Sequence, residues 1–401
     1  MLRTFNFIIF KIMRIGIDAQ TVLNPEKGSA SGLGHYTYQL IRYLLKTDTE
    51  NEYVLFVNYR VREKDLEKVK ANKNVTVRRF PFSYYKSFLP VVYSETLANA
   101  FFMRENLDVL HVPGGRLPIG YRRKFTTYAH DLALSKNPEL FPKKDMMKYR
   151  VKAPAYKRSN AVITTSEAGK KDLMEYFYVN EGKINVVHNA FDEKFYRVAT
   201  VDQIQAVKAK YGVDGEYILF MNTLKPINNL SRLIEAFSKL RMILKSDMPH
   251  SNYKLVLAGK SGWMADEIKQ IAKDFGLKND VIFTGYIKPQ DLNSLFDGAE
   301  VFVSVPIYED FGSSVLEAFS SGIPVVCSNV TSYPEITGGA AKMVDPYDVD
   351  GIRDAILDVL RDEGLRSEMK DKGMIQARKF HWDNTARETL KVFQQVAAKK
   401  K

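Results

Sequence analysis

Short apolar runs alternate with helical patterns along the whole chain. In the first half the apolar runs fall at 13–18, 53–58, 75–79, 108–112, 125–129 and 161–165, and in the second half at 217–221, 253–258, 280–284, 300–305, 324–328 and 341–344. Several of them are almost continuously apolar, which is typical of parallel strands covered by helices on both faces. The two sets predict an α/β protein with two Rossmann-like, doubly wound parallel-sheet domains facing a cleft.

The chain turns polar between the two sets of strands, at about 195–215. We therefore place an N-terminal domain at 1–200 and a C-terminal domain at 201–383. Past residue 350 the pattern is helical, and we expect the last helix, about 384–401, to pack back on the first domain. Ligands of open α/β sheets bind where strands end, so the polar segments after strands are the candidate sites.

One such segment, YEDFGSSVLEAFSSG at 308–322, carries two glutamates. The apolar run before it and Gly322 after it predict a helix that begins near Ser313 or Ser314. Glu309 then lies in the loop and Glu317 in the first helical turn. Ser314 to Glu317 also matches the S-x-x-E capping box, so one interpretation is a helix cap and a solvated loop acid.

The same segment also suits a nucleotide-diphosphate sugar. The backbone N–H groups of Phe311, Gly312 and Ser313, with the positive end of the helix dipole, favour an anionic diphosphate. Gly312 allows close approach of the backbone. In this interpretation Glu317 accepts hydrogen bonds from a ribose diol, and Glu309 accepts them from sugar hydroxyls.

The motif Y-E-D-F-G-x-x-V-L-E-A-F-x-x-G-x-P-V-V, followed by S-N-V-x-S-x-P-E, resembles the donor-binding signature of family 4 glycosyltransferases. These are retaining enzymes of the GT-B fold, and the group includes bacterial mannosyltransferase-like enzymes of glycan assembly. Segments 255–263, 281–287 and 341–352 resemble the second domain of the family. Segments 14–40, 110–115, 128–141 and 162–173 resemble the first.

The resemblance implies roles for residues of the first domain. His130 matches a histidine that lies beside the donor sugar and is needed for transfer, so His130 and Glu309 are the predicted catalytic residues. Gly34, in a Gly-Leu-Gly loop after the first strand, is expected to approach the donor diphosphate or the acceptor. Asp131 is expected to hold its loop, and His188 to be structural.

The start of the second domain departs from the family pattern. Relatives often read much like G-T-L-E-P-R-K-N-L, whereas this chain reads NTLKPINNL at 222–230. The two expected cations are replaced by Ile227 and Asn228. A departing diphosphate needs compensating charge, so Lys225 is predicted to assist the helix N-terminus in binding it, with Lys260 as a further candidate.

The net charge of +12 belongs to the first half, where 33 Lys and Arg outnumber 20 Asp and Glu; residues 201–401 carry 26 and 27. With no recognition motif for nucleic acid, this charge and a basic cluster at 143–158 suit a lipid-diphosphate acceptor at an anionic membrane surface. The aromatic stretch 82–104 is expected to be core, or alternatively an acceptor or membrane contact.

Other classes of site lack their motifs. The single cysteine, Cys327, sits in an apolar run and is expected to be buried and structural. We find no zinc-type spacing, P-loop or nucleophile elbow, so we expect no metal and no cofactor besides the donor. No stretch is apolar enough to span a bilayer, which predicts a cytoplasmic protein, alternatively peripheral at the inner face of the cell membrane. Residues 1–12 are expected to be a dispensable extension.

The leading hypothesis is a retaining hexosyltransferase of cell-surface polysaccharide or lipopolysaccharide synthesis. It would move a sugar from a nucleotide-diphosphate donor, with GDP-mannose or a UDP-sugar as best guesses, to a glycan or lipid-linked saccharide. Two alternatives stay open. One is a catalytically weak GT-B scaffold or binding subunit of a glycan-assembly complex, and the other is a nucleotide-sugar epimerase.

Overall fold

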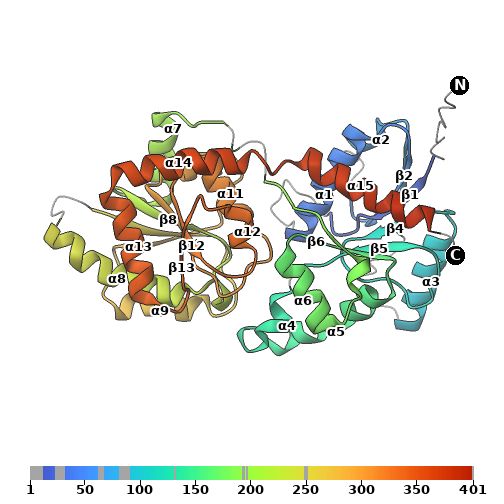
Figure 1. The fold of residues 1–401 in the computed structure, drawn as a ribbon, viewed down its shortest axis with the longest axis horizontal. Coiled ribbons are helices and arrows are strands. Elements are labelled where there is room, and N and C mark those ends of the chain that lie inside the picture. The colour runs from blue at the N-terminus through green and yellow to red at the C-terminus, as the bar shows by residue number, and fades with distance from the viewer. Residues whose placement is uncertain are drawn as a thin grey trace, which may run out of the picture.

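The structure of the chain is a computed structural model that describes residues 12–22, 32–61, 67–80, 91–130, 132–191, 195, 197–247 and 252–399. Two α/β domains lie side by side, each built around one parallel sheet (Figure 1). The fold class predicted from the alternation of strands and helices is confirmed.

The N-terminal domain contains a seven-stranded sheet in the order β3-β2-β1-β4-β5-β6-β7. Its strands are β1 Arg14–Asp18, β2 Glu52–Val57, β3 Val75–Arg79, β4 Val109–Val112, β5 Phe125–Tyr128, β6 Ala161–Thr164 and β7 Ile184–Val186. Every pair is parallel. The edge strand β7 was not predicted, because three residues in a polar context carry too little alternation to show.

Helices and short 3-10 turns connect these strands. They are α1 Gly32–Thr47, α2 Glu67–Lys70, α3 Val91–Met103, α4 Ala133–Lys136, η3 Pro138–Leu140, α5 Lys143–Arg158, α6 Glu167–Phe177 and η4 Glu181–Lys183. Of the aromatic stretch 82–104, Phe101 and Phe102 lie on α3 and pack with Phe56 and Phe80 in the core. Residues 81–90 of this stretch lie outside the described residues.

The C-terminal domain contains a six-stranded parallel sheet in the order β10-β9-β8-β11-β12-β13. Its strands are β8 Tyr217–Met221, β9 Lys254–Ala258, β10 Val281–Gly285, β11 Val301–Ser304, β12 Val325–Ser328 and β13 Lys342–Val344. The connecting elements are α7 Val201–Tyr211, η6 Pro226–Asn228, α8 Leu230–Asp247, α9 Ala265–Asp274, α10 Leu292–Asp297, α11 Ser313–Ser320, α12 Tyr333–Thr337, α13 Val349–Arg361 and α14 Glu363–Ala377.

The last helix, α15 Trp382–Ala398, leaves the C-terminal domain and lies along α1 of the other domain (Figure 1). Its buried positions Trp382, Ala386, Thr389, Phe393 and Val396 recur every three or four residues, which makes one largely apolar face. This face packs into the core of the N-terminal domain. The chain therefore crosses between the domains twice, once before α7 and once before α15.

Strand order fixes where a ligand can bind. In the C-terminal sheet the order reverses between β8 and β11, which are hydrogen-bonded neighbours. The loops after these two strands diverge at the carboxyl edge of the sheet, which is the switch point of a doubly wound fold. The segments 222–229 and 305–312 therefore lie together.

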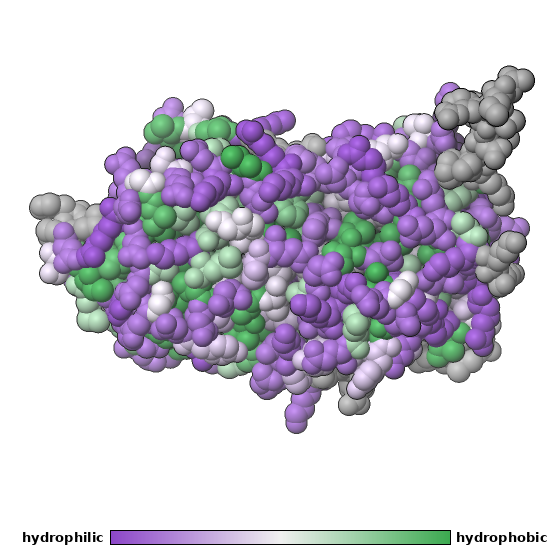
Figure 2. Space-filling model, in the orientation of Figure 1, coloured by the Kyte–Doolittle hydropathy of each residue, from purple (hydrophilic) through white to green (hydrophobic). Residues whose placement is uncertain are grey.

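Hydrophilic side chains dominate the face of the molecule in Figure 2, with apolar residues scattered among them. Of the predicted basic cluster, the side chains at 144, 148, 150 and 152 lie outside the described part of the chain. Cys327 is fully buried, and burial raises the pKa of its thiol, as expected of a structural residue. Among the described helices, none has the length and apolar character needed to cross a membrane.

Candidate active site

The loop after β11 brings several predicted donor-site residues into one segment. Two side chains from the segment before α12 hold it: Thr331 Oγ1 accepts from the Glu309 N–H at 3.0 Å and donates to the Glu309 carbonyl at 2.8 Å, and Ser332 Oγ donates to the carbonyls of Glu309 and Phe311. The Glu309 carboxylate turns back on its own loop, where it accepts from the Phe311 N–H at 3.5 Å. Glu309 is thus fixed by its surroundings.

Glu309 is a partly buried acid that faces positive groups. Burial raises the pKa of Glu309, and the backbone N–H groups of Phe311 and Gly312 and the charge of Lys225 act against this rise. Desolvation is the larger effect, so the carboxylate is less stable as an anion here than in water. A carboxylate in this state gains from hydroxyl donors that a bound sugar would supply.

Gly312 has a structural reason to be glycine. Its φ is +93°, and a Cβ at this position would come within 2.3 Å of the Tyr333 ring. The close contact that Gly312 allows is therefore with the Tyr333 ring of the protein itself, whereas the sequence suggested close approach to a ligand. Because Gly312 is the N-cap, α11 begins at Ser313, as predicted.

The predicted capping box of α11 is wrong. Gly312 provides no side-chain cap, and Ser314 is already the second helical residue, so it cannot act as the N-cap. Glu317 is then the fifth residue of the helix, one position past the first turn, and is partly exposed. Ser313 is exposed. The Phe311 ring is buried in the domain core, so only the backbone of this residue can reach a ligand.

The loop after β8 presents Lys225 and turns its next residues inward. Ile227 and Asn228 are 7% and 5% exposed. Ile227 joins an apolar cluster with Tyr308 and residues of the N-terminal domain. The Asn228 amide donates to the carbonyl of Thr223 at 2.6 Å and closes the loop. At these two positions relatives often have cations. In this chain Ile227 instead contacts the other domain, and the Asn228 side chain stabilises its own loop.

His130 follows β5 at the carboxyl edge of the other sheet. It is partly buried, and its ring stacks near Tyr128 with centroids 5.9 Å apart. Asp131 lies outside the described residues. Gly34 is buried, but it is the third residue of α1, so the expectation of a Gly-Leu-Gly loop is wrong for this part: the helix already begins at Gly32. The residues that precede it, 23–31, lie outside the described residues.

The loop that follows His130 is tied directly to the donor-site loop. The Leu132 N–H donates to Asp310 Oδ1 at 3.2 Å, and the hydroxyls of Thr165 and Ser166 donate to the Asp310 carbonyl. Asp310 was not singled out from the sequence, although it stands between two residues that were. Its role depends on how the domains meet, which a motif within one domain does not encode.

Further contacts cross between the domains near the site. Tyr308 OH donates to Asp172 Oδ2 at 2.6 Å. Glu335 accepts from the backbone N–H of Glu167 at 2.9 Å and bonds His188 Nε2 at 2.6 Å. The expectation that His188 is structural fits this position. Glu335 is the glutamate of the quoted S-x-P-E motif, and no role was predicted for it.

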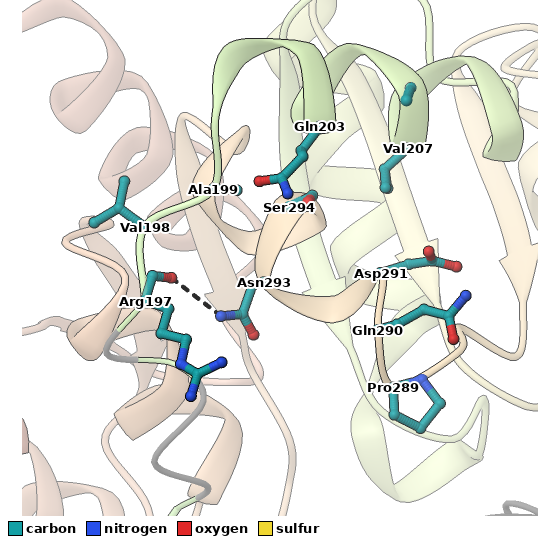
Figure 3. A pocket seen from close by; sticks show the side chains of 11 residues that line it. Arg197, Val198, Ala199, Gln203, Val207, Pro289, Gln290, Asp291, Asn293 and Ser294 are labelled. Atoms are coloured by element: carbon teal, nitrogen blue, oxygen red, sulfur yellow. Dashed lines mark hydrogen bonds between the residues drawn. The ribbon is translucent and has the colours of Figure 1, made fainter.

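A separate pocket opens between the segment 197–199, α7 and residues 289–294 (Figure 3). It contains none of the predicted site residues. The Asn293 amide donates to the Arg197 carbonyl at 3.1 Å across it. Its acid, Asp291, is already bound by Lys210 and Tyr211. The acid of this pocket is therefore already paired within the protein, and the carboxyl edges of the sheets remain the candidate site.

Two family models match the two domains in turn. The model described as Glycosyltransferase Family 4 matches residues 30–195, and the model described as Glycosyl transferases group 1 matches residues 203–375. O-antigen chain mannosyltransferase B of Escherichia coli is 28% identical over 384 residues, which is 92% of this chain and 97% of that protein. Serotype-specific mannosyltransferase WbdA of Escherichia coli is 31% identical over 248 residues, but the match spans 61% of this chain and 30% of WbdA.

Solved structures share the fold at low sequence identity. Anabaena HepE in complex with UDP and glucose superposes with a TM-score of 0.70 and 17% identity, over 94% of this chain and 98% of that one. WaaG, a glycosyltransferase involved in lipopolysaccharide biosynthesis, gives a TM-score of 0.70 and 12% identity, over 94% and 99%. The chain therefore belongs to the glycosyltransferases of the GT-B fold, with a family 4 domain followed by a group 1 domain.

Proposed function

We propose that this glycosyltransferase moves a mannosyl group from a nucleotide-diphosphate mannose to a saccharide acceptor, with retention of configuration, in the synthesis of an O-antigen-type polysaccharide. Glu309 holds hydroxyls of the donor sugar, Glu317 the ribose, and His130 the sugar near its reacting carbon. The backbone from Phe311 to Ser313 and the ammonium of Lys225 bind the diphosphate.

The observation that carries this proposal is the juxtaposition of the loops that contain Glu309 and Lys225 at the switch point of the C-terminal sheet. Their loops follow the neighbouring strands β11 and β8, and the charge of Lys225 acts on the Glu309 carboxyl. A carboxylate for hydroxyls beside a cation for phosphate is what a nucleotide-diphosphate sugar requires. The start of α11 adds backbone donors and a positive dipole end.

The reaction is a substitution at the anomeric carbon. The bond from this carbon to the diphosphate oxygen breaks, the acceptor hydroxyl oxygen forms the new bond on the same face, and the hydroxyl proton passes to the departing diphosphate. No protein carboxylate is proposed as a nucleophile. Negative charge grows on the diphosphate as it leaves, so fixed positive groups there stabilise the transition state more than the ground state.

The choice of sugar and acceptor draws on the relatives. Two of the matched relatives are mannosyltransferases of Escherichia coli, and one of them, O-antigen chain mannosyltransferase B, is matched over nearly its full length. HepE was solved with UDP and glucose, so a UDP-sugar is the competing donor. The basic first half of the chain suits an acceptor that carries a lipid diphosphate.

A donor screen with product analysis tests the proposal. The protein is incubated with GDP-mannose, UDP-glucose or other nucleotide sugars, and release of the nucleoside diphosphate is measured with and without a mannose-terminated oligosaccharide. NMR of the product then gives its anomeric configuration. We expect transfer from GDP-mannose with an α-linkage. Transfer with inversion would refute the proposed retention of configuration. Turnover with a UDP-sugar and none with GDP-mannose would refute the proposed donor.

Ile227 and Asn228 give one specific reason to test a second candidate, a catalytically weak scaffold subunit. The family pattern implies cations at these positions, and the loop instead turns both side chains inward. Donor hydrolysis or transfer above background that is lost in Glu309→Ala would exclude the scaffold. Release of an epimerised sugar without any acceptor would instead indicate an epimerase.

A further inference from the structure

Trp263 reaches from the C-terminal domain to the N-terminal domain. It lies in the loop between β9 and α9, and its indole N–H donates to the carbonyl of Leu140 at 3.1 Å. The ring also packs against Phe141, with centroids 5.3 Å apart and planes inclined by 40°. Leu140 ends the 3-10 turn η3 of the other domain, so this one side chain spans the interface.

The same indole ring makes a cation–π contact with Lys225. The Lys225 Nζ lies over it, 5.2 Å from the ring centroid. Indole is the aromatic side chain that attracts a cation most strongly. The charge of Lys225 also acts on the Glu309 carboxyl, so the cation that contacts the ring is the one that acts on the donor-site acid.

The backbone fixes the two loops against each other. The Leu224 N–H donates to the Lys260 carbonyl at 2.9 Å, and the Gly262 N–H donates to the Leu224 carbonyl at 3.0 Å. A Cβ on Gly262 would come within 2.6 Å of that same carbonyl oxygen and 2.8 Å of Lys225 Cγ. Trp263 is therefore held at a set place beside Lys225, whichever way the lysine side chain turns.

We propose that Trp263 is a positioning residue of the donor site: with the domains together, its ring orients the Lys225 ammonium toward the leaving diphosphate. This inference rests on the proposed glycosyl transfer. A lysine side chain is flexible, and fixing it loses rotamer entropy. A ring that is itself anchored on Leu140 restricts the ammonium before the reaction begins, so less reorganisation is needed when charge develops.

The test is a double-mutant cycle on the full chain. Trp263→Leu removes the ring, Trp263→Phe keeps an aromatic face but not the indole N–H, and Lys225→Met removes the cation. We expect Trp263→Leu to lower kcat about 2- to 30-fold, the range of a cation–π contact, with little change in KM. Trp263→Phe keeps a weaker aromatic face and loses the bond to Leu140, so it should lower kcat by less than Trp263→Leu. In the Lys225→Met background, Trp263→Leu has no further effect.

Binding of GDP and UDP, with guanosine and uridine as probes that lack the diphosphate, gives a readout that needs no turnover. Trp263→Leu and Lys225→Met weaken the binding of GDP or UDP by similar factors and leave the nucleosides unaffected. If the wild type binds a nucleoside diphosphate but turns over no nucleotide sugar, the proposed function fails while this comparison still tests the role of Trp263. Thermal unfolding confirms that each variant is folded.

Three results would overturn the inference. One is a multiplicative loss in the double variant, which would mean that Trp263 acts independently of Lys225. Another is an equal loss in Trp263→Phe and Trp263→Leu, which would assign the effect to the hydrogen bond with Leu140. The third is wild-type protein that binds neither GDP nor UDP.

Discussion

Replacing Glu309 by glutamine separates its contribution to function from its contribution to stability. The substitution keeps the size of the side chain and removes the charge. A hydrogen bond to a charged group contributes about 1.5–3 kcal/mol, and the sugar hydroxyls would lose such an acceptor. We therefore expect kcat/KM for the accepted donor to fall about 10- to 150-fold.

Although Glu309→Gln should lower activity, it should raise the free energy of unfolding at neutral pH. Burial raises the pKa of Glu309, so the folded state holds the proton more tightly than the unfolded chain. Ionising this carboxyl above its folded pKa therefore lowers the free energy of unfolding of the wild type. The glutamine side chain carries no such penalty, and its amide oxygen can still accept from the Phe311 N–H.

Urea unfolding as a function of pH checks the sign. Below the unfolded pKa of a glutamate, about 4.3, wild type and Glu309→Gln should have similar unfolding free energies. As the pH rises through the folded pKa, the variant should become the more stable of the two. Glu267→Gln, at an exposed carboxylate on α9, is the matched control and should change neither activity nor the pH dependence.

Two outcomes would refute this reasoning. If Glu309→Gln keeps wild-type kcat/KM, the carboxylate does not hold the donor sugar. If the variant is less stable than the wild type at neutral pH, then the bonds from the backbone N–H groups and the charge of Lys225 outweigh the desolvation of Glu309, and the site is a structural brace.

Three further predictions follow from the same region and from the charge of the chain. Ile227→Arg buries an unpaired charge between the domains and should lower the free energy of unfolding by about 3 kcal/mol in urea titrations, whereas Met242→Arg, at an exposed position, should not. Gly312→Ala must accept a positive φ and displace Tyr333, so its unfolding cost, about 2–4 kcal/mol, should exceed that of Gly276→Ala, where φ is also positive but the space is open. Vesicles with anionic lipid should bind the protein in sedimentation assays, with binding lost as salt rises from about 0.1 to about 1 M; binding to neutral vesicles would contradict an electrostatic contact.

The fold was predictable because buried parallel strands have a recognisable sequence pattern. Their continuous apolar runs, separated by helical patterns, predicted both sheets, and the polar segments that follow strands predicted a site at the carboxyl ends. The three-residue strand β7 is too short to show such an apolar run, so it was not predicted. The start of α1 at Gly32 was also missed, because two glycines suggested a turn while the apolar face of the helix compensates for their poor helix propensity.

Within the site, the motif placed the residues but not their local geometry. The S-x-x-E pattern suggested a cap, yet the left-handed Gly312 takes the N-cap position and leaves Ser314 inside the helix. The sequence showed that cations are absent at 227 and 228 but not what replaced them. The burial of Ile227 against the other domain depends on how two folded domains meet, and no pattern within one domain contains that information.

The domain interface and the donor site are built from the same short segments. Tyr308 and Asp310 bond the N-terminal domain on either side of Glu309. Ile227, two residues from Lys225, packs across the interface. Trp263 donates a hydrogen bond to Leu140 of the other domain and also contacts the Lys225 ammonium. A cation on the loop at 227 would act on a diphosphate whether or not the domains were together. With an apolar residue there, charge compensation depends on Lys225 and on the closed contact that holds it, so conditions that separate the domains should lower kcat before they unfold either domain.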